Sequence, residues 1–177
     1  MPKGTSTRGA IRNELHRSQA NYMNNAVDSM AMLEQPPVVL ADTAATTLTI
    51  ATHSGVTSIV PDQSQTNTYS IPTPTAAGQH YHFIYAGAVA DASNVIFRTV
   101  TTDGSVYFKG CLGFIIADPD ASATNAQITV YSDGDSNEML TCTTPGMIDV
   151  HFLSTSTTVW YVWGWSAAVA PITISNA

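Results

Sequence analysis

The chain has 177 residues, of which 44% are hydrophobic and only 11% are charged. This length corresponds to one domain whose core needs no disulfide or metal to support it, and the frequent β-branched and aromatic residues exclude a disordered chain. A charged fraction far below the usual ~25% is typical of a protein whose surface is partly covered by neighbours.

Residues 1–37 form the first predicted unit, a basic arm that contains a helix. Apolar side chains recur at helical spacing between residues 11 and 33, and Pro36 and Pro37 end the pattern because proline cannot continue a helix. The first twenty residues hold four basic residues and one acidic residue, whereas the rest of the chain holds two and twelve. The arm either docks on another surface or is an ordinary polar tail. If it docks, the expected partner-binding residues are Arg8, Arg12, Leu15, Arg17, Tyr22, Met30 and Leu33.

Residues 38–177 form the second predicted unit, a β domain. Short β-prone runs are separated there by Gly, Pro, Asp, Asn and Ser, with turns at 103–104, 133–134 and 145–146. The expected strands cover residues 46–52, 66–71, 80–86, 95–101, 105–108, 112–116, 126–132, 138–143, 147–153, 159–165 and 172–175. This spacing predicts a mostly β fold, either an antiparallel sandwich or a jelly-roll-like barrel, with the helical arm at its N-terminus.

The expected strand from Val159 to Trp165 has large apolar residues at both odd and even positions. Alternate side chains of a strand point to opposite faces of the sheet. One face should therefore fill the core, while the arm or another subunit covers the other, because large exposed apolar patches are uncommon on monomers. We expect a subunit interface at Trp160, Tyr161, Trp163 and Trp165.

His80 and His82 would lie on one face of a strand, an arrangement that resembles the metal-binding start of cupins. A cupin would add a glutamate a few residues later and a further histidine in a later strand. No carboxylate follows His82 closely, and the neighbours of His151, which could supply the distant ligand, match no cupin pattern. We therefore expect a pair of imidazoles on a solvent-facing or partner-facing strand, and no bound metal.

Two acidic turns offer oxygen ligands of the kind that calcium accepts, at residues 118–120 and 133–138. Neither has the spacing of an EF-hand loop. We expect hairpin turns at both places rather than ion sites.

The sequence contains no motif that indicates an enzyme or a cofactor site. A Gly-x-Ser-x-Gly motif and a phosphate-binding glycine loop are both absent. Cys111 and Cys142 lack a catalytic or metal-ligand spacing, and they form either one disulfide or two free thiols, of which we favour the thiols. The acidic charge of residues 21–177 argues against direct nucleic-acid binding. No stretch approaches ~18 uninterrupted apolar residues, and residues 1–10 show no signal-peptide pattern, so we expect a protein without membrane contact that is made in a cytoplasm.

Four stretches together resemble a β module found in structural proteins of tailed bacteriophages: residues 69–72, 77–83, 128–135 and 159–165. Similar modules occur in capsid decoration (cement) proteins, including those of cyanophages, and in some fibre proteins. The resemblance covers about residues 40–166 and leaves the arm as an addition.

The resemblance implies a homotrimeric cement protein on the outer capsid surface of a virion, after synthesis in the host cytoplasm. Its partners would be the major capsid protein, between whose subunits it would bind to stabilise the head, and further copies of itself. The alternative is a fibre module that binds host glycans through exposed aromatic side chains. A cupin-like enzyme is the third possibility.

Overall fold

The computed structural model describes residues 36–87, 93–116, 126–168, 170 and 172–177. By its internal contacts the chain divides into two compact units, Met1–Pro36 and Pro37–Ala177. The predicted helical arm and its seven partner-binding residues lie outside the described residues. In the part that is described, no helix has the length and apolar character needed to cross a bilayer.

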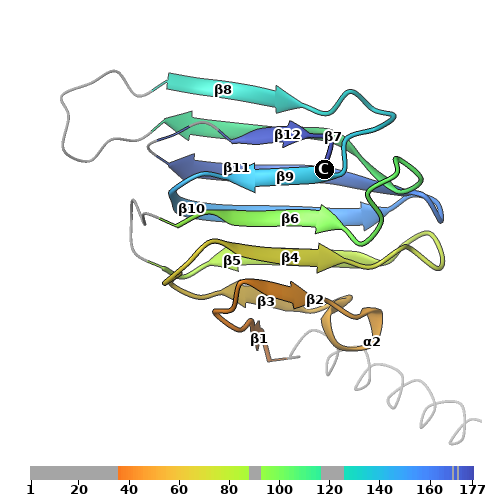
Figure 1. The fold of residues 1–177 in the computed structure, drawn as a ribbon, viewed down its shortest axis with the longest axis horizontal. Coiled ribbons are helices and arrows are strands. Elements are labelled where there is room, and N and C mark those ends of the chain that lie inside the picture. The colour runs from red at the N-terminus through yellow and green to blue at the C-terminus, as the bar shows by residue number, and fades with distance from the viewer. Residues whose placement is uncertain (1–35, 88–92, 117–125, 169, 171) are drawn as a thin grey trace, which may run out of the picture. The chain divides into compact units, whose positions relative to one another are not determined.

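The described residues from 37 onward form two β-sheets, and Figure 1 shows their strands. In spatial order, the large sheet consists of β1 (Val38–Val39), β3 (Thr57–Val60), β5 (His80–Tyr85), β10 (Pro145–Ser154), β11 (Val159–Ala168), β7 (Tyr107–Ile116) and β8 (Ala126–Tyr131). The small sheet consists of β12 (Thr173–Ser175), β9 (Met139–Cys142), β6 (Val95–Thr99), β4 (Asn67–Ile71) and β2 (Ala45–Thr47).

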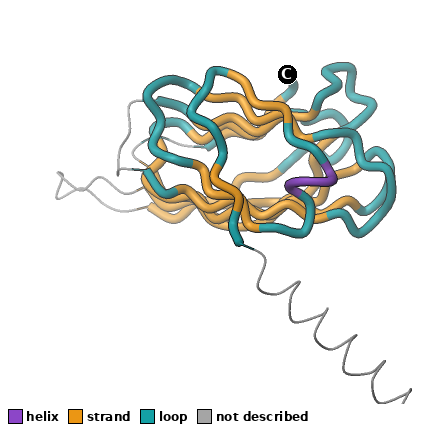
Figure 2. The backbone as a smooth tube through the Cα atoms, turned by 90° about the horizontal axis from the view of Figure 1, so that it is seen from below, coloured by secondary structure: helices purple, strands orange, loops and turns teal. Residues whose placement is uncertain are grey.

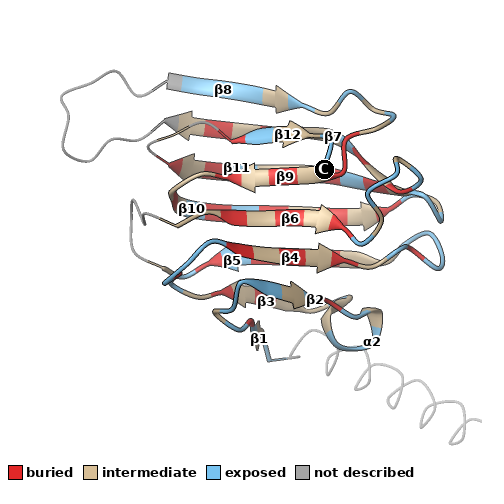
Figure 3. Ribbon diagram, viewed as in Figure 1, coloured by how far each residue is buried: buried red, intermediate tan, exposed pale blue. Residues whose placement is uncertain are grey.

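The two sheets lie face to face as two layers (Figure 2), and buried segments run along the strands of both (Figure 3). Aromatic rings from the two layers meet between them. Phe97 of the small sheet lies 4.6 Å from Phe83 and 5.6 Å from Phe152 of the large sheet, measured between ring centroids. All three side chains are fully buried. The prediction of a mostly β sandwich is therefore confirmed.

The prediction of antiparallel pairing, and with it the jelly-roll form, is wrong for this molecule. Of the ten strand pairs in the described residues, five are parallel and five antiparallel. From β2 to β6 the chain enters the other sheet after each strand, so β2, β4 and β6 are parallel neighbours in the small sheet. A jelly roll consists of antiparallel strands throughout. Connections such as residues 61–66 and 72–79 cross between layers, whereas a tight hairpin would keep both strands in one sheet.

Most of the expected strands form, with four differences. Residues 107–108 of the run 105–108 and the whole run 112–116 belong to the single strand β7, which continues through Gly110. The run 46–52 is cut short because Ile50–His53 form a helical turn, α2, whose first turn is capped by the Thr49 hydroxyl. Strands β1 and β3 were not predicted. Pro145 begins β10 instead of forming a turn, and the change of direction lies before it, at Thr144, which has a φ of 44°.

Two glycines allow the central strands of the large sheet to approach closely. A Cβ atom on Gly164 would lie 2.1 Å from the carbonyl oxygen of Asp149, and one on Gly110 would lie 2.1 Å from that of Val162. Both glycines also have positive φ values, 140° and 133°, which other residues adopt only with strain. These two glycines allow β10, β11 and β7 to pack closely. The spacing of the strands in turn sets how far apart their outer-face side chains lie.

Candidate functional site

The outer face of the large sheet brings together chemically active side chains from three adjacent strands. Alternation along the strands places His80 and His82 of β5, Asp149 and His151 of β10, and Trp163 of β11 on this face. The register sets His82 directly opposite His151, and His151 directly opposite Trp163. Residues separated by up to 83 positions in the sequence are therefore neighbours across the sheet.

The rings of these residues stack against one another. The centroids of His82 and His151 are 4.1 Å apart with 4° between their planes, and those of His151 and Trp163 are 5.0 Å apart with 7° between them. His80 lies beside both His151 and Trp163, at 5.2 and 5.8 Å. We call His80, His82, His151 and Asp149 the imidazole cluster.

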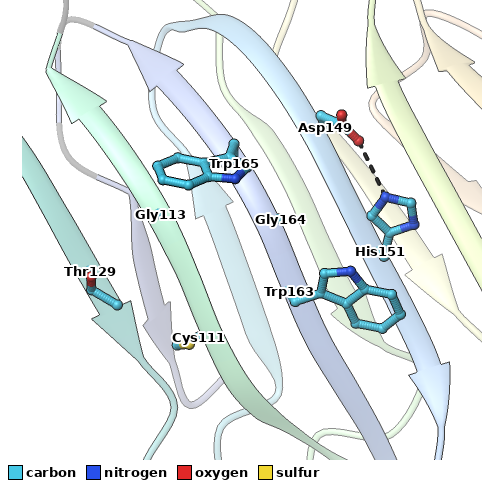
Figure 4. A pocket seen from close by; sticks show the side chains of 8 residues that line it. All are labelled: Cys111, Gly113, Thr129, Asp149, His151, Trp163, Gly164 and Trp165. Atoms are coloured by element: carbon cyan, nitrogen blue, oxygen red, sulfur yellow. Dashed lines mark ion pairs between the residues drawn. The ribbon is translucent and has the colours of Figure 1, made fainter.

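Polar contacts orient each ring of the imidazole cluster. His82 Nε2 lies 2.9 Å from Asp149 Oδ1, and His82 Nδ1 lies 3.0 Å from Thr57 Oγ1. Since an ionised carboxylate only accepts hydrogen bonds, neutral His82 donates through Nε2 and accepts the Thr57 hydroxyl at Nδ1. His151 Nε2 lies 3.4 Å from the same Asp149 oxygen, a contact marked by the dashed line in Figure 4, while His151 Nδ1 is 3.0 Å from His80 Nε2.

The surroundings favour neutral imidazoles at two positions. Burial lowers the pKa of His80, and the neighbouring His151 and His82 lower it further. Burial also lowers the pKa of His151, with His82 adding to the effect, although Asp149 opposes it. A lowered pKa keeps a histidine uncharged and its ring nitrogen available as an acceptor or a ligand near neutral pH.

A cleft of about 530 Å³ adjoins the cluster (Figure 4). It is lined by Cys111, Gly113, Thr129, Asp149, His151, Trp163, Gly164 and Trp165. The cleft therefore combines two indole rings with one carboxylate and one imidazole. This is a surface on which a planar or ring-shaped group can stack while a polar group binds at its edge.

The rest of the outer face is largely apolar and open to solvent. Tyr161 and Trp165 are 42% and 45% exposed, and Tyr131 of β8 is 71% exposed. Trp160 does not belong to this face: its side chain is fully buried between the sheets, and its indole N–H donates to the carbonyl oxygen of Pro72 at 3.1 Å. The expectation that Trp160 contributes to a subunit interface is thus corrected, and Tyr161, Trp163 and Trp165 remain as the outward members of that set.

The two cysteines are free thiols in different sheets, as favoured from the sequence. Cys111 is partly exposed in the cleft, whereas Cys142 is buried against the core. Complete burial raises the pKa of the Cys142 thiol to about 12.

The acidic turn at residues 133–138 is held together by its own hydrogen bonds. Asp133 Oδ1 accepts from the backbone N–H groups of Asp135, Ser136 and Asn137, and Oδ2 accepts from the side chains of Ser136 and Asn137. These donors, chiefly the Ser136 hydroxyl, lower the pKa of Asp133 to about 2. Both oxygens of this carboxylate are already occupied, which fits a structural turn better than a calcium site. The other acidic turn, at residues 118–120, lies outside the described residues.

Sequence reasoning found His80 and His82 as a pair and named His151 as the one possible distant partner. It did not include Asp149, because that residue matched no known motif. The usable signal was the alternation Asp149-x-His151, which puts a carboxylate and an imidazole on the same face of a strand.

Comparisons with protein-family models, with curated proteins and with solved structures find no match for this chain.

Proposed function

We propose that the chain is a virion structural protein, a capsid decoration (cement) protein that binds between major capsid subunits and stabilises the head. The proposal assigns it no catalytic role and no contact with nucleic acid or membrane. One observation carries most of the weight: the apolar outer face of the large sheet. Its exposed large side chains are Ile84, Tyr131, Met147, Tyr161 and Trp165.

The composition of this face favours a protein contact over a solvated surface. Apart from histidine, only Lys109 and Asp149 carry a formal charge in the seven strands of the large sheet. Aromatic side chains surrounded by few charges are typical of the energetically important centre of an interface. We therefore assign the outer face to association between copies of the chain. A cyclic trimer is the form that the resemblance to cement proteins favours.

The oligomeric state tests this assignment. Trp165→Asp would place a charge in the middle of the proposed interface, and an uncompensated buried charge strongly opposes association. Val100→Asp is the matched control, since Val100 is similarly exposed at 42% but follows β6 of the small sheet. Light scattering should show an oligomer for the unmodified protein and the control, and a monomer for Trp165→Asp. A stable monomer in all three cases would contradict the self-association.

Capsid binding tests the wider proposal. The full chain should cosediment with empty heads of the phage that encodes it, and deletion of residues 1–37 should abolish this while leaving the β domain folded. Leu15→Asp should weaken attachment more than Arg12→Ala, because a buried leucine contributes roughly 1.5–3 kcal/mol and an exposed charge about 0–1 kcal/mol. If the truncated chain cosediments as well as the full chain does, the β domain rather than the arm makes the capsid contact.

A fibre module that binds host glycans is the second candidate, favoured by the cleft beside the imidazole cluster. Trp163 and Trp165 offer faces on which a sugar ring can stack, and Asp149 offers an acceptor for its hydroxyl groups. Binding to a glycan array that is lost in Trp163→Ala and kept in Val100→Asp would favour this candidate over the cement protein.

A further inference from the structure

Three atoms of the kind that bind transition metals converge on the outer face of the large sheet. One ligand atom each from His82, Asp149 and His151 lies within 4.8 Å of the other two. They come from two adjacent antiparallel strands, in which His82 and His151 are directly paired and Asp149 is two residues before His151. The rigid sheet, rather than a loop, therefore sets their separation.

We propose that His82, Asp149 and His151 form a binding site for a divalent transition-metal ion of the zinc type. Two imidazole nitrogens and one carboxylate oxygen suit zinc and its neighbours in the first transition row. Calcium and magnesium prefer shells made of oxygen atoms. The proposal departs from the expectation, drawn from the lack of a glutamate after His82, that this strand binds no metal.

The distances between the ligand atoms are close to those that a metal requires. Bonds to zinc of about 2.0–2.2 Å in a tetrahedral arrangement place neighbouring ligand atoms about 3.3–3.6 Å apart. Asp149 Oδ1 lies 2.9 Å from His82 Nε2 and 3.4 Å from His151 Nε2. Because the two imidazole rings are almost parallel, they must tilt toward each other when an ion binds between them.

The opposite nitrogen of each imidazole already has the partner that a metal-binding histidine needs. Histidine ligands usually hold a hydrogen bond at the nitrogen that does not face the metal, which orients the ring. His82 Nδ1 contacts the Thr57 hydroxyl at 3.0 Å, and His151 Nδ1 contacts His80 Nε2 at 3.0 Å. Both Nε2 atoms are thereby directed at Asp149. When a metal binds His82 Nε2, the ring proton moves to Nδ1, from which it donates to Thr57 Oγ1.

With three protein ligands, the site leaves a coordination position open. The Asp149 side chain is about half exposed and also lines the cleft, so water reaches this position in the isolated protein. Three protein ligands and one exchangeable ligand differ from the four protein ligands of most structural zinc sites. The site does not depend on the proposed capsid role, and it is tested on the protein alone at a concentration where the chain is monomeric, because the same face is assigned to self-association.

Zinc titration of the full chain, after treatment with EDTA and dialysis, tests the proposal. Isothermal titration calorimetry should show one zinc ion bound per chain, and calcium in place of zinc should produce no binding at this site. His151→Gln and Asp149→Asn each remove a ligand at a solvent-facing position, and circular dichroism verifies that they fold. Thr57→Val removes only the orienting hydroxyl, and should weaken zinc binding about 10- to 100-fold. The two ligand variants should weaken it more.

His53→Gln is the matched control, because it also removes an imidazole, but one that contacts Thr49, the residue that caps α2, and is neither a proposed ligand nor an orienting partner of one. Zinc binding should be unchanged in this variant. Absence of zinc binding by the unmodified chain would overturn the proposal. So would binding that persists in both ligand variants, or that falls as much in His53→Gln as in His151→Gln. None of these results depends on whether the protein binds capsids.

Discussion

On the inner face of the large sheet, Phe83, Phe152 and Trp160 are completely buried, whereas on its outer face Tyr161 and Trp165 remain 42% and 45% exposed. The two faces consist of the same strands and of similar side chains. They differ in that the small sheet covers the inner face. The inner aromatics therefore stabilise the fold, while the outer aromatics are available for binding.

The histidines also distinguish the inner face of the large sheet from its outer face. None of the side chains of the imidazole cluster belongs to the core, and all of them lie on the outer face. Polar groups that can bind ions or protons would be costly between two apolar layers. In the imidazole cluster, the side chains that can bind ions or protons lie on the face that the small sheet leaves uncovered.

The largest expected effect comes from the inner face. Phe152→Ala should lower the free energy of unfolding by about 3–5 kcal/mol, since it leaves a cavity among Phe83, Phe97 and Phe108. Trp165→Ala, on the outer face, should change it by less than about 1 kcal/mol. Urea denaturation of the two variants measures both values, at a protein concentration where the chain is monomeric. Equal losses would contradict the distinction between the faces.

Gly164 matters for both faces of the large sheet, because its position sets how closely β11 approaches β10. Any residue other than glycine is strained at its positive φ, and a Cβ there would also collide with the backbone of Asp149. Gly55→Ala isolates the backbone strain from the collision, because Gly55 has a φ of 79° and open space around it. This substitution should lower the free energy of unfolding by about 1–2 kcal/mol. Gly164→Ala should lower the free energy of unfolding by about 1–3 kcal/mol more than Gly55→Ala does, because its Cβ also overpacks the space between the strands. Thermal unfolding compares the two, and a smaller loss for Gly164→Ala would show that the strands can separate.

The last prediction tests the exposure of the two cysteines by chemical labelling and involves no loss of stability. At pH 8 iodoacetamide should modify Cys111 in the folded protein and leave Cys142 unmodified. Cys142 is buried, and its pKa of about 12 leaves almost no reactive thiolate. Mass spectrometry of peptides should show the label at one site, with both sites labelled after denaturation in urea. Native labelling of Cys142 would mean that the sandwich opens.

The amino-acid sequence by itself determined that residues 38–177 are β structure, because turn residues divide the chain into short β-prone runs. It also determined that the strand from Val159 to Trp165 has two apolar faces, since alternation along a strand is a local property. It indicated the His80 and His82 pair for the same reason.

Only the tertiary structure decided which strands pair and what the pairing brings together. A local pattern does not specify the sheet that the next strand joins, so the parallel neighbours β2, β4 and β6 were not foreseen. The short strand β3 has too few residues for a clear alternation. Asp149 meets His82 across 67 positions of sequence, and such a contact depends on the register of two distant strands. A register is set by the packing of the whole sandwich rather than by the residues on either strand alone.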